Sequence, residues 1–353
     1  QRSAVFLALV AAASGSHVLS ELRDRVISAE AEALTGQALV DYVNAHQQFF
    51  KTKLNPRYAG ITEERKRKMI NGLAQSMEDL AAELDKEGRV THNVLAADVP
   101  EFFDAREAWP KCPSIGFIRD QSTCGACWAF STAEVISDRM CISSGGSQQF
   151  NISADDLLAC CGFQCGMGCQ GGYVLQAMKF WVSHGVVTGS GYEAAQGCKP
   201  YPFPPCEHHN NHTGYTQCDK TPDYHTPSCE KACQSGYPLT YLQDKHFGKS
   251  AYGLSTKVID IQTEIMLNGP VVAPFSVYED FEQYSFGVYV HNGGKYIGGH
   301  AVKVIGWGTE NGTPYWLAVN SWNSDWGENG FFRIIRGTNE VGFEEGMVAG
   351  LPK

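Results

Sequence analysis

Apolar residues recur at two different spacings along this chain, and the spacing changes near its middle. In the first part they recur every three or four residues, the period of an α-helix with one buried face. The groups are Leu39, Val40 and Val43; Met69, Ile70, Leu73, Met77 and Leu80; Ala129, Ala133, Ile136 and Met140; and the stretch 173–182. They predict helices in the first half of the chain.

The second half carries short runs that alternate or stay apolar between Gly and Asn turns, which is typical of β-strands. The expected strands cover 271–277, 287–290, 301–307, 315–320 and 331–335. Helices followed by strands, without the alternation of a βαβ unit, indicate an α+β fold. With 353 residues, 43% of them hydrophobic, the chain is long enough to bury a core in two lobes.

The N-terminal part differs from the rest and predicts two removable segments. Arg2 precedes an apolar run over 4–13 and small residues at 14–16, which indicates a signal peptide over 1–16 that is too short to span a bilayer. Residues 17–98 hold no cysteine and are rich in Ala, Glu, Lys and Arg, so we interpret them as a propeptide. A mature domain over 99–353 is expected to follow, and no other segment predicts a membrane span.

Charge and cysteine content limit the classes of protein. A net charge of −10 argues against a nucleic-acid partner, and the basic run over 63–68 is better explained by a solvated helix face. All 13 cysteines lie between Cys112 and Cys233, which indicates disulfides formed in an oxidising compartment, and their odd number leaves one thiol unpaired. Sites of the form Asn-x-Ser/Thr occur at Asn151, Asn211 and Asn311. We therefore expect a glycoprotein that is secreted or in a lysosomal lumen.

The candidate nucleophile is Cys127, within Arg119-Asp-Gln-Ser-Thr-Cys-Gly-Ala-Cys-Trp-Ala-Phe130. The helical pattern puts it at or beside a helix N-terminus, where the dipole favours a thiolate, although a structural disulfide is an alternative. A thiolate nucleophile needs an imidazole and a group that orients it. We select His300, ahead of a predicted strand, and Asn320, whose amide is expected to hold the ring through Nδ1. Trp322 would shield that contact from water.

Cys124-Gly-Ala-Cys127-Trp, followed by His300 and Asn320 in that order, resembles the papain family of cysteine proteases. The resemblance implies a papain-like fold, with a helical left lobe, a β-barrel-like right lobe and a cleft between them. It also implies an oxyanion hole built from the Gln121 side chain and the Cys127 backbone N–H. No metal or organic cofactor is implied.

The spacing and one loop narrow the resemblance to the cathepsin B-like type. Cys127 and His300 are 173 residues apart, whereas about 130–150 is usual for the family. The cysteine-rich stretch at about 198–233 is the candidate insertion. It holds Cys206-Glu-His-His209 and resembles an occluding loop, in which His208 and His209 would hold a substrate's C-terminal carboxylate. Metal binding by the histidines is the alternative there.

The resemblance also implies a disulfide pairing and a set of substrate-binding residues. The implied pairs are Cys112–Cys141, Cys124–Cys169, Cys160–Cys229, Cys161–Cys165, Cys198–Cys233 and Cys206–Cys218, which leave Cys127 free. The implied substrate-binding residues besides the two loop histidines are Gly171, Gly172, Tyr173, Gly299, Ala301, Trp322 and Gly346.

Several positions depart from the mammalian cathepsin B pattern. Ser122 replaces the usual Gly, Gln170 the usual Asn, and Val174 and Pro274 differ in the pocket for the second residue before the cut. Gly346 stands where a Glu would pair with a basic residue, so we expect that pocket to prefer hydrophobic residues. The stretch 210–217 lacks an Arg for one of two loop ion pairs, which predicts a loop that opens readily.

Together these observations predict a zymogen of a cysteine peptidase with endopeptidase and dipeptidyl carboxypeptidase activity, working at acidic pH. Its expected partners are peptide and protein substrates, its own propeptide as an inhibitor, and cystatin-type inhibitors. The stretch Tyr315-Trp-Leu-Ala-Val-Asn-Ser-Trp-Asn-Ser-Asp-Trp-Gly-Glu328 resembles gut cathepsin B enzymes of blood-feeding nematodes. The alternatives are a catalytically inactive papain-fold binding protein and a metal-binding, disulfide-rich module.

Overall fold

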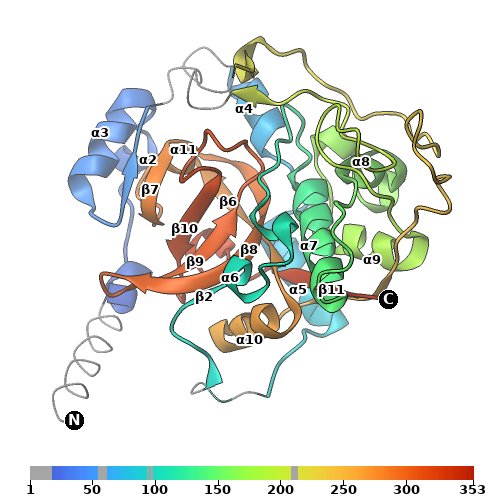
Figure 1. The fold of residues 1–353 in the computed structure, drawn as a ribbon. Coiled ribbons are helices and arrows are strands. Elements are labelled where there is room, and N and C mark those ends of the chain that lie inside the picture. The colour runs from blue at the N-terminus through green and yellow to red at the C-terminus, as the bar shows by residue number, and fades with distance from the viewer. Residues whose placement is uncertain (1–17, 55–61, 94, 96–97, 208–213) are drawn as a thin grey trace.

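The computed structural model describes residues 18–54, 62–93, 95, 98–207 and 214–353. A group of helices and a mixed sheet pack side by side, and the N-terminal segment runs over both (Figure 1). The predicted α+β character is confirmed. None of the described helices has the length and apolar character needed to cross a bilayer.

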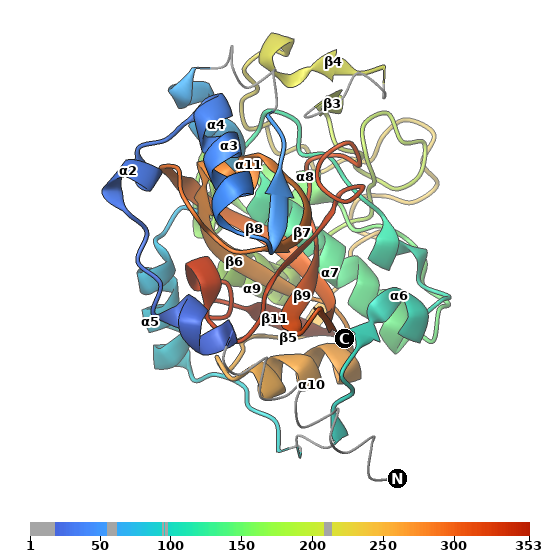
Figure 2. The same cartoon turned by 90° about the vertical axis from the view of Figure 1, so that its left-hand side faces the viewer.

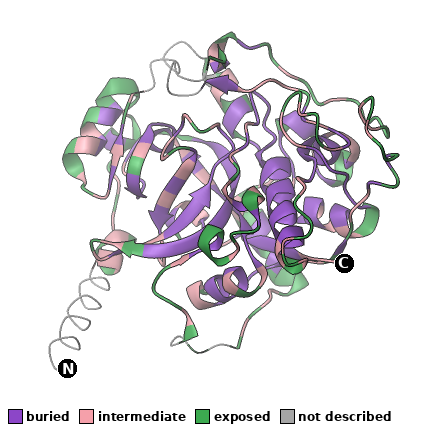
Figure 3. Cartoon of the chain, in the orientation of Figure 1, coloured by how far each residue is buried: buried purple, intermediate pink, exposed green. Residues whose placement is uncertain are grey.

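The helical side is built on α7 (Cys127–Ser143), α8 (Ala154–Cys160) and α9 (Val174–His184). Helix α7 is buried on nearly all of its faces (Figure 3). The apolar periods predicted both α7 and α9, and in α9 the buried side chains recur at the helical spacing. Local sequence sets the ends of the shorter helices: Ser153 caps α8 through a bond from Asp156 N, and α9 ends at Gly185 in a left-handed conformation.

The sheet holds nine strands in the order β1-β7-β10-β9-β8-β6-β11-β5, with β2 pairing β8 off this path. The strands are β1 (Phe50–Thr52), β2 (Phe103–Asp104), β5 (Gly248–Gly253), β6 (Val271–Tyr278), β7 (Tyr284–Tyr289), β8 (Tyr296–Glu310), β9 (Thr313–Val319), β10 (Phe331–Ile335) and β11 (Val348–Pro352). This order is an open path, so the expected barrel-like lobe is an open sheet and not a closed barrel. All five predicted strands are present, and β10 has the predicted bounds.

The N-terminal segment contributes α2 (Ala29–Glu32), α3 (Gly36–His46), β1 (Phe50–Thr52), α4 (Glu63–Ile70) and α5 (Met77–Glu87). Figure 2 shows α3 and β1 lying over the outer end of the sheet. Leu39, Val40 and Val43 form the buried face of α3, as their spacing predicted. The second predicted stripe is not one helix. It is broken over residues 71–76, which bond to Gly299 of β8 and to Gly172 ahead of α9, before Ser76 caps α5.

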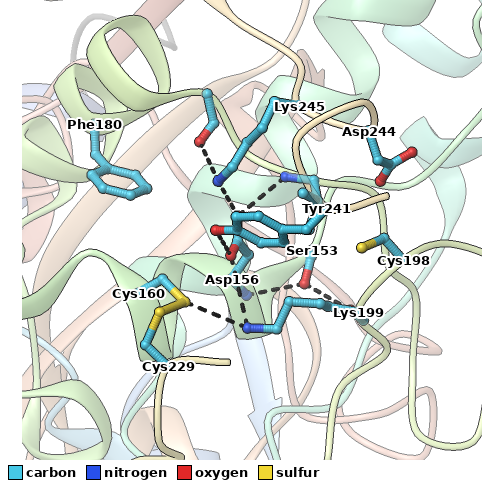
Figure 4. A network of polar contacts seen from close by, with 12 residues as sticks. Ser153, Asp156, Cys160, Phe180, Cys198, Lys199, Cys229, Tyr241, Asp244 and Lys245 are labelled. Atoms are coloured by element: carbon cyan, nitrogen blue, oxygen red, sulfur yellow. Dashed lines mark hydrogen bonds and ion pairs between the residues drawn. A yellow bond between two sulfur atoms is a disulfide. The ribbon is translucent and has the colours of Figure 1, made fainter. Parts of the chain in front are cut away.

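Six disulfides close the cysteine-rich region, and all six agree with the implied pairing. In its described residues, 198–207 and 214–233, the loop over 198–233 carries only short elements, β3 (Cys206–Glu207), β4 (Thr216–Gln217) and η6 (Cys218–Lys220). Lys199 at its base pairs with Asp155 of α8 at 3.2 Å. Just beyond the loop, Tyr241 and Lys245 each donate to Asp156 of α8 at 2.8 Å (Figure 4). The remaining short elements are α6 (Ala105–Ala108), α10 (Val258–Asn268), α11 (Glu279–Glu282), η3 (Pro113–Gly116), η4 (Gly162–Gln164), η5 (Gly168–Gln170) and η7 (Glu340–Gly342).

Candidate active site

The N-terminus of α7 carries the free thiol. Cys127 is the first residue of the helix, its side chain is fully buried, and it is the one unpaired cysteine among the described residues. The alternative of a structural disulfide at this position is therefore wrong. The first turn of a helix presents backbone N–H groups and partial positive charge, both of which favour an anion at such a position.

His300 lies inside β8 and not ahead of it, opposite Phe275 of β6. Its Nε2 is 2.8 Å from Oδ1 of Asn320, so the expected contact through Nδ1 is wrong. Because that oxygen is an acceptor, Nε2 carries the proton of the contact. Nδ1 is buried without a hydrogen-bond partner among the described residues. The ring of Trp322 lies over the imidazole at 4.7 Å between centroids and is 2% exposed, so it excludes water from this pair.

Gln121 is held rigidly beside these groups. Its Oε1 accepts from Oγ of Ser321 at 2.6 Å, and its backbone N–H donates to the Ser321 carbonyl at 3.0 Å. Its Nε2 donates to the carbonyl oxygens of Cys124 at 3.0 Å and of Met69 at 2.9 Å. The next residue, Ser122, adopts φ 56, a left-handed conformation that explains why glycine is usual there.

Burial shifts the pKa values of Cys127 and His300 in opposite directions. It raises the pKa of the Cys127 thiol to about 12, although hydrogen bonds from the backbone of Ala301 and Gly72 oppose the shift. Burial also lowers the pKa of His300 to about 4, against the opposing hydrogen bond to Asn320. Burial therefore favours the uncharged forms of both side chains while the segment between α4 and α5 covers them.

The cover is the segment between α4 and α5. Gly72 lies against the thiol, because a Cβ built on it would be 2.2 Å from Cys127 Sγ. Its backbone N–H donates to the Gly299 carbonyl at 2.9 Å, and its carbonyl accepts from Gly172 N at 3.1 Å. Ala74 N then donates to the Gly172 carbonyl at 3.0 Å. The segment thus spans from the helical side of the cleft to β8 by these backbone hydrogen bonds, and Asn71 Oδ1 accepts one more from Gly299 N at 2.9 Å.

The remaining predicted substrate-binding residues gather around the same segment. A Cβ on Gly171 would meet the Leu73 backbone at 3.1 Å, and one on Gly299 would meet the Leu73 side chain at 2.9 Å. At Gly346 an added Cβ would meet side chains of the N-terminal segment, Leu80 Cδ2 at 2.8 Å and Met77 Cε at 3.0 Å. Two further predicted residues adjoin the site, Tyr173 just before α9 and the fully buried Ala301 in β8.

His208 and His209 lie outside the described residues. The alternative of metal binding by the loop histidines falls on the same undescribed residues and stays a prediction. The basic run over 63–68 is more than a solvated face. Arg65 donates to the Cys218 carbonyl at 3.0 Å, and Lys68 pairs with Asp223 at 3.5 Å, so α4 rests on the loop over 198–233.

Sequence reasoning missed two contributors to the site. Ser321 fixes the Gln121 side chain, and nothing in its local sequence indicates that role, because the two residues are 200 positions apart. Gly72 was also missed, although Asn71-Gly72 is a dipeptide that commonly ends a helix or marks a turn. That signal would have predicted that a helix ends near residue 71 and that a second one begins before Leu80.

The comparisons with known proteins agree with this geometry. The model of the family described as papain family cysteine protease matches residues 99–351. The chain is 51% identical to cathepsin B-like cysteine proteinase 6 of Caenorhabditis elegans, over 95% of this chain and 88% of that protein. It is 53% identical to the gut-specific cysteine proteinase of the same nematode, over 91% of this chain and 92% of that protein.

Solved structures agree as well. The procathepsin B S9 of Trypanosoma congolense superposes with a TM-score of 0.74 at 38% identity, covering 92% of this chain and all of that one. The digestive procathepsin L 3 of Tenebrio molitor, at 19% identity and a TM-score of 0.62, shares the fold. Both are proenzymes, in which a propeptide is bound to the protease domain. The chain therefore belongs to the papain family of cysteine proteases, as a cathepsin B-like cysteine peptidase.

Proposed function

We propose that Cys127 is the nucleophile, His300 the acid and base, Asn320 the group that orients the imidazole, and Gln121 a donor of the oxyanion hole. The observation that carries this assignment is the contact of Gln121 Nε2 with the Met69 carbonyl, beside the free thiol at the start of α7. An amide carbonyl in the cleft is thus already bound by the donor that a substrate carbonyl would need. The His300–Asn320 contact lies on the facing sheet.

The reaction follows from these positions once the cover is removed. The Cys127 thiolate attacks the peptide carbonyl carbon, and the new oxyanion is stabilised by Gln121 Nε2 and the Cys127 N–H. His300 then transfers a proton from Nδ1 to the leaving amine, because its Nε2 is occupied by Asn320. The C–N bond breaks and leaves a thioester. Water, deprotonated by the same Nδ1, hydrolyses the thioester and restores the thiolate–imidazolium pair.

The segment over 17–98 acts as the propeptide, after a signal peptide over 1–16, and the mature enzyme spans 99–353. Gly72 against the thiol and the fully buried Cys127 support this proposal, since no substrate reaches a covered nucleophile. N-terminal sequencing of the acid-processed protein tests the boundary. A new N-terminus more than a few residues from Val99 would contradict it.

The pocket that ends at Gly346 selects a hydrophobic substrate residue at the second position before the cleaved peptide bond. Apolar side chains of the propeptide, Leu80 and Met77, lie at this position, and Gly346 has no side chain to pair with a basic residue of a substrate. Matched peptides with Leu or Arg at that substrate position test the preference. Comparable kcat/KM values for the two peptides would contradict the assignment of Gly346.

The loop over 198–233 makes the enzyme a dipeptidyl carboxypeptidase as well as an endopeptidase, with His208 and His209 holding the substrate's C-terminal carboxylate. Matched peptides with a free or amidated C-terminus decide this, with Cys127→Ser as the blank. Preference for the free acid supports the clamp. Equal cleavage means that the loop stands open and that the enzyme is chiefly an endopeptidase.

The setting proposed for the enzyme is protein digestion at acidic pH, in a secreted or lysosomal compartment, with cystatin-type proteins as inhibitors. Six disulfides support an oxidising compartment, and one nematode relative is named gut-specific. The competing function is an inactive papain-fold binding protein. Absence of any peptide cleavage that Cys127→Ser abolishes would establish that alternative.

A further inference from the structure

Strand β7 lies at the outer edge of the main domain's part of the sheet, and its outer partner comes from the N-terminal segment. Within the described residues β7 pairs with β10 on one side, and on the other only with β1, which comes from the N-terminal segment. The pairing of β1 is antiparallel, with Phe50 opposite Gly287 and Thr52 opposite Tyr284. Flanking bonds run from Val288 N to the Phe49 carbonyl at 2.8 Å and from Lys53 N to the Gln283 carbonyl at 2.9 Å.

One aromatic side chain of β1 enters the main domain. Phe50 is 1% exposed and packs edge-on against Tyr289 at 5.2 Å and parallel to Tyr284 at 6.2 Å. Gly287 permits this approach, because a Cβ there would lie 2.5 Å from the Phe49 carbonyl oxygen and 2.7 Å from the Phe50 Cα. Backbone pairing and one aromatic pocket thus recognise the strand.

The main domain itself holds this site in shape. The Tyr289 hydroxyl donates to Asp280 Oδ1 at 2.7 Å. Glu328 Oε1 accepts from the Tyr284 hydroxyl at 3.0 Å and from Gly287 N at 2.7 Å. These bonds involve no residue before 99, so removal of the N-terminal segment leaves both tyrosines and the edge of β7 in place.

We propose that, in the processed enzyme, the outer edge of β7 and the pocket formed by Tyr284 and Tyr289 are an exosite for an extended, aromatic-containing segment of an unfolded protein substrate. The inference rests on the proposed removal of residues 17–98. An unpaired edge strand with a preformed apolar pocket recognises a peptide by strand addition, with backbone bonds for affinity and one pocket for specificity.

The spacing of the two sites favours a long substrate as the occupant. In the precursor one chain occupies both, with Phe50 at β7 and Met69 at Gln121, 19 residues apart. An unfolded protein long enough to bridge them gains effective concentration at the cleft once its aromatic segment is bound at β7. A short peptide cannot bridge the sites and gains nothing.

The test uses the wild-type processed enzyme and a competing peptide with the sequence of residues 46–53, His-Gln-Gln-Phe-Phe-Lys-Thr-Lys, blocked at both ends. The control is the same peptide with Phe50→Ala. Two substrates are compared, a four-residue fluorogenic peptide and a reduced, carboxymethylated protein. We expect the first peptide to raise KM for the unfolded protein about five-fold without changing kcat, and to leave the short substrate unaffected.

Other results would overturn the exosite. Equal inhibition of both substrates would place the peptide in the cleft, and no effect on either would mean that β7 binds nothing. An enzyme that is dimeric by size-exclusion chromatography and dissociates with the peptide would identify a second copy as the occupant. Cleavage of the short substrate that depends on Cys127 is measured in each case. Its absence would reject the proposed function, whereas its presence without competition rejects the exosite alone.

Discussion

Single residues at this site are positioned by partners that are distant in sequence. Gln121 is fixed by Ser321, and His300 by Asn320. Each contact leaves one reactive group aimed into the cleft: the Gln121 amide N–H on one side and His300 Nδ1 on the other. The buried charges behind the site are equally constrained, and they give the molecule a pH dependence of its own.

Gln121→Ala is expected to lower kcat about 10²–10³-fold while KM changes little, because an oxyanion-hole donor acts on charge that appears only in the transition state. The measurement is steady-state kinetics of the processed enzyme on a short peptide. Gln148→Ala, at an exposed position after α7, is the matched control and should retain full activity. A rise in KM with unchanged kcat would instead assign Gln121 to substrate binding.

The raised pKa of Glu134 leads us to expect that the folded protein is more stable in acid than at neutral pH. It lies on α7 near Lys303, Arg119 and Asp138, and burial raises its pKa to about 7. A raised pKa in the folded state contributes stability that is fully present below the unfolded value of 4.5 and is lost as pH rises through about 7. The contribution is about 3 kcal/mol at most.

Urea unfolding of the Cys127→Ser precursor between pH 4.5 and 8 measures this effect without self-digestion. Glu134→Gln should reduce the change in the free energy of unfolding between pH 4.5 and about 7. Glu107→Gln, on the exposed face of α6, should leave it unchanged. A Glu134→Gln curve parallel to that of the parent would show that Glu134 does not titrate in this range.

At the scale of elements, the segment between α4 and α5 is the part whose form departs most from its sequence pattern. Met69, Ile70, Leu73, Met77 and Leu80 fit one helical stripe, yet the chain is non-helical from Asn71 to Ser76. The gain that overrides helix propensity is tertiary, because Gly72 and Ala74 bond to Gly299 and Gly172 in the cleft. The same interruption brings Gly72 against the thiol.

Gly72→Ala should therefore uncover the nucleophile. The added Cβ meets Cys127 Sγ at 2.2 Å, and such overpacking costs about 1–3 kcal/mol. This corresponds to a roughly 5- to 150-fold rise in the open fraction. The rate at which iodoacetamide alkylates Cys127 in the intact precursor should rise accordingly. Ala82→Ser, on the exposed face of α5, is the control, and equal rates for the two variants would refute the contact.

At the scale of the whole molecule, disulfides stabilise a region poor in regular structure. The part of the loop over 198–233 that the structure describes has only short elements, and the loop's ends are held by Cys198–Cys233 and Cys160–Cys229. A crosslink lowers the entropy of the unfolded chain by an amount that grows with the length of chain it closes. The crosslinks that close the longer stretches of chain are therefore expected to contribute most to the free energy of unfolding.

Two neighbouring disulfides allow a direct comparison. Cys160–Cys229 spans 69 residues and Cys161–Cys165 spans 4. Replacing both partners by Ala should destabilise the protein by about 4 kcal/mol in the first case and about 2 kcal/mol in the second. Urea unfolding of the Cys127→Ser precursor at one pH measures both. A larger loss from the short crosslink would mean that native packing, and not chain entropy, dominates there.

The sequence by itself determined the helices α7 and α9, the strands of the sheet, the family, and through it the free cysteine and the disulfide pairing. These follow from local periodicity and from motifs whose residues are near one another in the chain. The predictions that were wrong concern features that depend on partners distant in the sequence. Strand β8 begins before His300 because Gly298 and Gly299 pair with β6, a partner that local sequence does not specify.

Only the tertiary structure decided which nitrogen of His300 meets Asn320, that burial favours the uncharged forms of Cys127 and His300, and that β7 has its outer partner in the N-terminal segment. Each depends on segments far apart in sequence. Hydrogen-bond geometry and the desolvation of a charge are fixed by what surrounds an atom in space. The sequence pattern therefore cannot predict the hydrogen-bond partner or the burial of an atom whose neighbours come from distant parts of the chain.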